Sequence, residues 1–397
     1  MATEPQWIYI DTPTTLERFC SELRLQIESN PWLALDTEFM RERTYHPQLC
    51  LLQVGTLDSI ACIDPLRLDN LDPLLDIIYD ARVTKVFHAA HQDLEIFYLL
   101  RKAVPTPIFD TQLAAPLLGH PNQAGYAVLV QNILGVTLHK GHARTDWSRR
   151  PLSEAQLSYA ADDVRYLGQI YVKLREQLID EGRLGWLDND FARLGDPQRY
   201  ACNPASAWKR IRASKRLRGK ALAILKAVAA WREETAHKRN IPRNWLLRDD
   251  MLCDLAKLAP RSSEELKQVR GIGDKQFRLL EDDVLPLIRT ALDSTADRDE
   301  PPVTVSPRPT PEQEAVMEAL LAVVHLQALQ NDMHPATLAG RKDIERWLLE
   351  PEQHSELMNG WRREMIGKPL QAMLEGRLSL RIHDGHLQLH DNDGHSS

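Results

Sequence analysis

A run of apolar residues that ends in two closely spaced acids constrains this chain more than any other stretch. The run Leu33–Phe39 reads Leu-Ala-Leu-Asp-Thr-Glu-Phe, which predicts a buried β-strand. Side chains two positions apart in a strand point to the same face, so Asp36 and Glu38 project together. Two like charges about 4 Å apart repel by roughly 4 kcal/mol at an effective dielectric constant of about 20. A divalent cation offsets this repulsion; for the motif alone, a strand end whose acids face water is the alternative.

Composition narrows the kinds of site that the chain can hold. The 397 residues are 43% hydrophobic and 26% charged, as expected for a globular protein of several domains. The five cysteines form no Cys-x-x-Cys pair or His cluster, which argues against zinc sites and disulfides and favours a reducing compartment. No secretory signal is visible, and no stretch approaches the roughly 18 uncharged apolar residues of a membrane span. We therefore expect a cytoplasmic protein without membrane contact.

The sequence changes character near residue 200, from alternating strands and helices to helices alone. Strand-like segments are 7–10, 33–39, 49–55, 59–64, 84–88 and 107–110. Helical segments lie between and after them, and this alternation predicts an α/β domain with a mixed sheet flanked by helices. The boundaries that we expect are 1–195 for the α/β domain, 205–293 and 311–380 for two helical domains, 294–310 for a linker and 381–397 for a polar, frayed tail.

Positive charge is concentrated in the first helical domain. Residues 205–248 contain 13 Lys or Arg and two acids, although the whole chain has a net charge of −7. Such an asymmetry favours an anionic partner such as nucleic acid. A basic helical face that is simply solvated is the alternative.

Two further acidic motifs follow the first. Asp93 lies where an apolar strand passes into a helix, a place where α/β folds expose functional groups, and a helix cap is the alternative for a single Asp. Tyr159 and Asp163 are four positions apart on a long predicted helix and therefore share a face. The tyrosine hydroxyl then lies near the acid and can orient a water molecule. A core tyrosine beside a solvated acid is the alternative.

Together the three motifs resemble the DEDD exonuclease superfamily. Asp-x-Glu at 36–38, Asp93 and Tyr-x-x-x-Asp at 159–163 match its pattern, and the tyrosine indicates the tyrosine-bearing branch. The histidine-bearing branch has a His at the position of Ser158. The flanking segments Phe39-Met40-Arg41, Leu52-Gln53-Val54 and Asp146-Trp147 resemble ribonuclease D. Residues 205–292 also resemble an HRDC domain, and residues 311–380 a second, more diverged copy.

The resemblance implies a ribonuclease H-like fold and metal-dependent hydrolysis of RNA from its 3′ end, with release of 5′-mononucleotides. Precursor tRNA is the substrate that the family suggests. Two Mg²⁺ or Mn²⁺ ions would supply an attacking hydroxide and stabilise the leaving oxygen, and such cations prefer oxygen ligands. Asp36 would bridge the two ions, Glu38 and Asp163 would complete the first site, and Asp93 would serve the second. Tyr159 would orient the attacking water.

The resemblance also suggests residues that contact the substrate. Phe39 and Met40 are candidates to stack against the terminal bases, and His88 is a candidate for a further contact. The helical domains would follow the RNA backbone. The basic side chains expected to contact phosphates are Lys209, Arg210, Arg212, Lys215, Arg216 and Arg218. No protein partner is indicated.

Two other functions remain open from the sequence. The same catalytic acids also suit a 3′–5′ exonuclease that acts on DNA, because hydrolysis of either backbone uses the same metal chemistry. A non-catalytic nucleic-acid-binding protein belongs to another class, and it would be expected to lack at least one of the acids. All of them are present in this chain.

Overall fold

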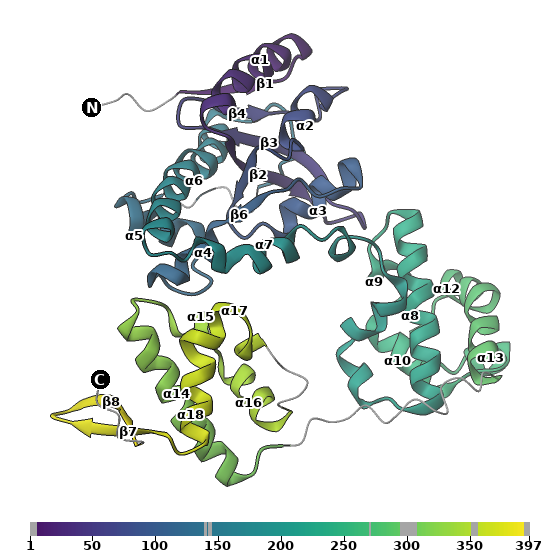
Figure 1. Cartoon of the computed structure of the whole chain (residues 1–397). Helices are drawn as coiled ribbons and strands as arrows, with labels where there is room; N and C mark the ends of the chain where they lie inside the picture. The colour runs from purple at the N-terminus through teal and green to yellow at the C-terminus, as the bar shows by residue number, and fades with distance from the viewer. Residues whose placement is uncertain are drawn as a thin grey trace. The chain divides into compact units, whose positions relative to one another are not determined.

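The computed structural model of the chain describes residues 6–138, 141, 145–269, 271–293, 308–350 and 356–392, and these form two compact units (Figure 1). The sheet unit contains the described residues up to Glu38, those of Leu49–Arg199 and those from residue 308 onward. The helical unit contains Phe39–Gln48 and the described residues from Tyr200 onward to residue 293. Most of the predicted linker, residues 294–307, lies outside the described residues.

A six-stranded sheet forms the centre of the sheet unit. Its strands are β1 (Trp7–Ile10), β2 (Trp32–Met40), β3 (Gln48–Gly55), β4 (Ile60–Ile63), β5 (Thr84–Phe87) and β6 (Ile108–Asp110). They lie in the order β1-β4-β3-β2-β5-β6, so β2 has neighbours on both sides. The pairs β1–β4, β2–β5 and β5–β6 are parallel, whereas β3 and β4 are antiparallel. The predicted α/β fold with a mixed sheet is confirmed.

Helices flank the sheet, and the longest of them, α6, carries two of the predicted site residues. The helices are α1 (Pro13–Ser29), α2 (Asp72–Ile78), α3 (His91–Arg101), α4 (Thr111–Ala114), α5 (Tyr126–Leu134), α6 (Glu154–Asp180) and α7 (Asp188–Leu194). Helix α6 begins at Glu154, because Ser153 and Gln156 cap each other's backbone amides reciprocally. Such a pair satisfies two amide groups that a helix start would otherwise leave unpaired.

Two glycines allow α6 to lie unusually close to the sheet. A Cβ atom at Gly55 of β3 would lie 3.1 Å from Cβ of Val164 in α6. A Cβ atom at Gly168 of α6 would lie 2.8 Å from the indole ring of Trp32 in β2, a distance that real Cβ atoms do not adopt. Trp32 is itself buried, so its ring has little room to move. Close packing therefore fixes α6 against β2 and β3.

A buried ion pair holds the loop that leads into α6. Arg150 donates hydrogen bonds from Nη2 to Oδ1 of Asp64 at 2.8 Å and to the carbonyl oxygen of Cys50 at 2.6 Å. The Asp64 side chain is fully buried and also accepts from the Tyr9 hydroxyl. Burial alone would raise the pKa of Asp64, but the hydrogen bonds from Arg150 and Tyr9 hold it below its usual value. The ion pair thus joins the ends of three strands to this loop.

The helical unit is a bundle around one apolar core. Its helices are α8 (Gly219–Arg239), α9 (Arg243–Leu246), α10 (Asp249–Leu258), α11 (Ser263–Leu266), α12 (Asp274–Leu279) and α13 (Leu285–Asp293). Leu225, Val228, Leu252 and Ile288 are fully buried in the core. A π-helical turn, Leu280–Val284, connects α12 and α13.

The second helical region packs within the sheet unit. It consists of α14 (Pro311–Gln330), α15 (Pro335–Leu338), α16 (Arg341–Leu349), α17 (Gly360–Arg362) and α18 (Lys368–Leu374). The indole rings of Trp186 and Trp361 stack with their centroids 4.5 Å apart. Arg183 donates to the carbonyl oxygens of Leu117 and Asn331 and so connects the second helical region to the rest of the sheet unit.

No helix among the described residues is long and apolar enough to span a membrane.

The end of the described chain is ordered, which corrects the prediction of a frayed tail. Strands β7 (Leu378–His383) and β8 (His386–Asp391) form an antiparallel hairpin. Asp384 and Gly385 connect them, both with positive φ, as a tight two-residue hairpin turn requires. Alternating apolar residues on both sides of Asp-Gly were the sequence signal for this hairpin. Residues 393–397 of the predicted tail lie outside the described residues.

Candidate active site

Three of the four predicted acids come together between β2 and α6. Asp36 and Glu38 lie on β2, and Asp163 lies on α6. Each offers one carboxylate oxygen, and these three atoms lie within 4.8 Å of one another. Among the described residues this is the one group of three acidic, His or Cys side chains with such spacing. The arrangement can hold a hard divalent cation through oxygen ligands.

The alternation of β2 explains which of its side chains join this group. Trp32 contacts Gly168 of α6, so Asp36 and Glu38, at even spacing from Trp32, face α6 as well. Leu33 and Leu35 point to the opposite face and are fully buried in the core. The close approach of α6 at Gly168 then sets the distance between Asp163 and the acids of the strand.

Asp93 is not one of these three acids, and it has a hydrogen-bond partner of its own. The Thr37 hydroxyl donates a hydrogen bond of 2.5 Å to Oδ1 of Asp93. Asp93 is in the first turn of α3 but does not cap it, because the N-cap position is occupied by Ala90. The buried carboxylate of Asp110, at the end of β6, accepts from the amides of Ala89 and Ala90 and holds this turn. Neither Thr37 nor Asp110 was predicted from the sequence to take part in the site.

Burial and mutual repulsion make the four acids weak acids in the protein without metal. Burial, then repulsion from Asp163 and Asp93, raises the pKa of Glu38 to about 8. Burial, followed by repulsion from Asp162 and Asp93, raises the pKa of Asp163 to about 7. Burial also raises the pKa of Asp93 to about 7, and that of Asp36 rises well above its usual value. A cation that binds here would therefore displace protons near neutral pH.

Tyr159 lies one helical turn before Asp163 and is half-buried. Burial, then repulsion from Asp163 and Glu38, raises its pKa far above the usual value, so the phenol stays protonated and remains a hydrogen-bond donor. Its ring lies beside that of Trp147, with centroids 6.3 Å apart. The Tyr126 hydroxyl donates to the carbonyl oxygen of Asp162 at 2.9 Å and braces this part of α6.

The residues predicted to contact substrate beside the acids, Phe39, Met40 and His88, differ in their surroundings. Phe39 and Met40 end β2 and are half-buried, and the Arg41 guanidinium lies 5.8 Å from the centre of the Phe39 ring. His88 is engaged on both ring nitrogens, by the Thr111 hydroxyl at 2.9 Å and the Ala124 carbonyl oxygen at 3.0 Å. Burial lowers the pKa of His88, so its ring is neutral. A substrate contact by His88 would have to use the ring carbons.

The predicted phosphate-binding residues lie on or directly after two short 3-10 helices of the helical unit, Pro204–Arg210 and Arg212–Arg216. All six side chains are exposed. Three of them also make contacts within the protein. The Lys209 ammonium lies 5.9 Å from the centre of the Trp208 ring. Arg210 pairs with Glu233 at 3.3 Å, and Arg218 donates to the carbonyl oxygens of Lys215 and Leu217.

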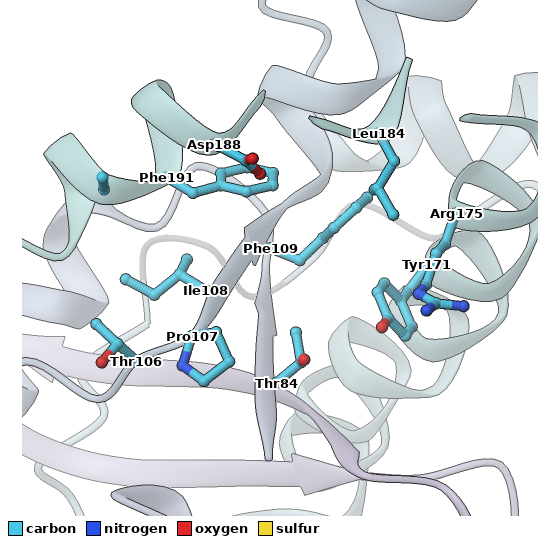
Figure 2. Close-up of a pocket in the computed structure, with 11 residues that line it drawn as sticks. Thr84, Thr106, Pro107, Ile108, Phe109, Tyr171, Arg175, Leu184, Asp188 and Phe191 are labelled. Atoms are coloured by element: carbon cyan, nitrogen blue, oxygen red, sulfur yellow. The ribbon is translucent and has the colours of Figure 1, made fainter. Parts of the chain in front are cut away.

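A separate cavity of about 440 Å³ lies at the edge of the sheet (Figure 2). Pro107 and Phe109 of the β6 region, Tyr171 of α6 and Phe191 of α7 contribute to its lining. Its one acid is Asp188, so the cavity lacks the carboxylates that a cation would need. It is distinct from the acidic group.

Comparisons with known proteins identify relatives over nearly the whole chain. Residues 7–179 match the 3′-5′ exonuclease family, and residues 221–288 match the HRDC domain. Ribonuclease D of Granulibacter bethesdensis is 38% identical over 390 residues, covering 94% of each chain. Ribonuclease D of Sphingobium indicum is 40% identical over 381 residues, covering 94% of this chain and 96% of the relative.

A solved structure resembles the whole fold as well. The crystal structure of Escherichia coli RNase D, described as an exoribonuclease involved in structured RNA processing, superposes with a TM-score of 0.78 at 33% identity. The match covers 94% of this chain and 99% of that one. The likeness therefore includes both the sheet with its acids and the helical regions.

Proposed function

The chain belongs to the ribonuclease D family of 3′–5′ exoribonucleases, and from this premise we propose that it trims the 3′ ends of precursor tRNA. The observation that carries the catalytic part is the group of three carboxylate oxygens within 4.8 Å, one helical turn from a protonated tyrosine. Asp36, Glu38, Asp93, Tyr159 and Asp163 are the residues to which we assign the chemistry. RNA with a free 3′ end is the substrate class.

The carboxylates are the groups that would hold the metal ions. We assign Asp36, Glu38 and Asp163 to one divalent cation, with Asp36 shared by a second that Asp93 also serves. When bound, two such ions, Mg²⁺ or Mn²⁺, supply hydroxide near neutral pH and stabilise the charge on the leaving 3′-oxygen. The oxygen-only ligand set, without Cys or His, suits these hard cations. Thr37 orients the Asp93 carboxylate through its 2.5 Å hydrogen bond.

Tyr159 acts on the attacking water rather than on a metal ion. Its hydroxyl is protonated and can donate a hydrogen bond, because burial and the neighbouring acids raise its pKa far above the usual value. From its place one turn before Asp163 it can donate a hydrogen bond to the water and fix the direction of the lone pair that attacks phosphorus. Trp147 packs against the tyrosine ring and restricts its rotation.

The helical unit is proposed to hold the RNA body by its phosphates. Its exposed Lys and Arg side chains at 209–218 offer positive charge without a code for base sequence. Removal of these charges should weaken RNA binding equally for different sequences and reduce its salt dependence.

A cytoplasmic site of action agrees with the cysteines, none of which takes part in a disulfide.

Digestion of defined RNAs tests this function directly. A structured RNA with a 3′ single-stranded extension is incubated with Mg²⁺ or Mn²⁺, and the products are resolved nucleotide by nucleotide. We expect stepwise shortening from the 3′ end, release of 5′-mononucleotides, and loss of both with EDTA or in Asp36→Asn. A single-stranded DNA of the same sequence is the control. Faster hydrolysis of the DNA, or normal RNA cleavage by Asp36→Asn, would contradict the proposal.

A further inference from the structure

The catalytic strand continues directly into a segment that belongs to the helical unit. Phe39–Gln48, which connects β2 to β3, begins one residue after Glu38 and clusters with the helical unit rather than with the sheet. It is bound by Glu233 of α8, by Asn240 directly after α8 and by Arg243 of α9, all far away in the sequence. We call this stretch the connecting segment. It carries Phe39 and Met40, the residues proposed to meet the terminal nucleotide.

The end of α8 binds the backbone of the connecting segment. Asn240 is the C-cap residue of α8 and has a left-handed conformation with φ of 49°. Its side-chain oxygen Oδ1 accepts from the backbone amide of Tyr45 at 3.1 Å and from that of His46 at 3.0 Å. One side chain thus satisfies two consecutive amides, which fixes the direction of the segment at this point.

Side chains reinforce the same attachment. The Tyr45 hydroxyl donates to Oε1 of Glu233 at 2.6 Å, and Glu233 is only 2% exposed. Arg243 donates to the same Oε1 at 2.7 Å and to the Tyr45 hydroxyl at 3.0 Å, and its guanidinium lies 4.5 Å from the centre of the Tyr45 ring. His237 packs edge-to-face against the rings of Tyr45 and His46.

The attachment is costly to break because its centre is charged and buried. Burial alone would raise the pKa of Glu233, but hydrogen bonds from Arg243 and Tyr45 hold it below its usual value, so the carboxylate is ionised. A buried carboxylate that loses a partner is left with an unsatisfied charge. The connecting segment is therefore held by bonds that do not exchange readily with water.

We propose that Asn240, Glu233 and Arg243 are positioning residues of the nuclease: by fixing Tyr45 and His46, they hold Phe39 and Met40 in place for the 3′-terminal nucleotide. The inference rests on the proposed function and adds a second task for the first helical domain. A loose segment would have to be ordered again each time RNA binds. Misplacement of a reacting group by about 1 Å can reduce the rate by about a hundredfold.

Asn240→Gly isolates this role. Glycine accepts the left-handed conformation of the C-cap but lacks the oxygen that receives the two amides. Asn240→Asp restores an acceptor at the same place and should behave as the wild type. Asp249→Asn is the matched control. It weakens an ion pair between Asp249 of α10 and Arg232 of α8, and this pair does not involve the connecting segment.

The activity of these variants is measured on a trinucleotide substrate, with the full-length protein and Mg²⁺ or Mn²⁺. Its few phosphates give the basic side chains at 209–218 little to hold, so it reports on the terminal nucleotide. We expect Asn240→Gly to lower kcat/KM for the trinucleotide about tenfold, mainly through kcat. Asp249→Asn and Asn240→Asp should stay close to the wild type.

Limited proteolysis provides a readout that does not depend on activity. Arg41 and Arg43 are exposed within the connecting segment, and trypsin cleaves after arginine. Asn240→Gly should accelerate cleavage at these two sites, whereas Asp249→Asn should not. Unchanged kinetics and unchanged cleavage in Asn240→Gly would overturn the inference, as would an equal loss of activity in Asp249→Asn. If the wild type hydrolyses no RNA, the proposed function fails instead, and the cleavage rates still test the attachment.

Discussion

Replacement of Glu38 by glutamine should stabilise the metal-free protein although it removes nuclease activity. Burial and the neighbouring acids raise the pKa of Glu38 from its ordinary 4.5 to about 8. Each pKa unit corresponds to about 1.4 kcal/mol, so ionised Glu38 costs the folded state on the order of 5 kcal/mol. The neighbouring acids share protons with Glu38, and we expect about 2–3 kcal/mol to appear in the measured free energy of unfolding. Glutamine has the shape of protonated glutamate and avoids this cost.

The stability difference follows pH in a defined direction. Below about pH 4, Glu38 is protonated in both the folded and the unfolded chain, and the two proteins should be equally stable. As the pH rises, the unfolded chain loses this proton first, because its pKa is the lower one. The wild type therefore becomes less stable than Glu38→Gln until the pH passes the folded value of about 8. Above that pH the difference stays constant.

Thermal unfolding of EDTA-treated protein measures this difference. Near pH 8 we expect Glu38→Gln to unfold roughly 5 °C above the wild type, and no difference near pH 4. Glu176→Gln, an exposed position on α6, is the control that should change nothing. Addition of Mg²⁺ should stabilise the wild type and not Glu38→Gln. A variant that is less stable than the wild type near pH 8 would refute the idea that the acids repel one another in the absence of metal.

Three further variants separate catalysis from folding. Asp163→Asn should reduce RNA hydrolysis by about a thousandfold or more, because it removes a proposed metal ligand, while the circular dichroism spectrum stays unchanged. Tyr159→Phe should lower kcat about tenfold to a hundredfold without a change in Mn²⁺ affinity, as measured by titration calorimetry; weaker Mn²⁺ binding would instead make the hydroxyl part of the metal site. Arg150→Met should lower the free energy of unfolding by about 3–5 kcal/mol in urea, because it leaves the fully buried Asp64 without its cation. A smaller loss would show that the Tyr9 hydroxyl suffices.

The acids of the site were predictable because local rules govern them. The period of two in a strand places Asp36 and Glu38 on one face, and the period of the helix places Tyr159 near Asp163. The hydrogen bond from Thr37 to Asp93 was not predictable, because Thr37 points away from the acids on its own strand and meets a residue that the sequence places far away. The role of Asp110 was not predictable for the same reason. Its partners are amides of another turn, and no sequence pattern marks a backbone donor.

The fold shows a similar division between local and distant information. The hairpin at Asp384-Gly385 had a clear signal in its turn residues and in the alternation of its strands, whereas the predicted frayed tail rested on polar composition alone. The membership of Phe39–Gln48 in the helical unit had no such signal. It depends on Asn240 and Glu233, nearly 200 positions later, and on the exact direction in which their side chains leave a helix. Sequence periodicity describes one helix or strand at a time, so it does not predict which distant side chains will bind this segment.

Two glycines at the contact between α6 and the sheet, one in the helix and one in β3, control the spacing of the proposed metal site. Gly55 and Gly168 set how far α6 stands from β2, and this spacing in turn sets the gap between Asp163 and Asp36. A single methyl group at either glycine would lift the helix and widen the gap, although it would touch neither metal nor RNA. Mg²⁺ demands short, regular bonds to oxygen, whereas larger cations tolerate longer and less regular ones. The apolar packing of α6 against β2 and β3 therefore controls the geometry that the carboxylates would offer to an ion.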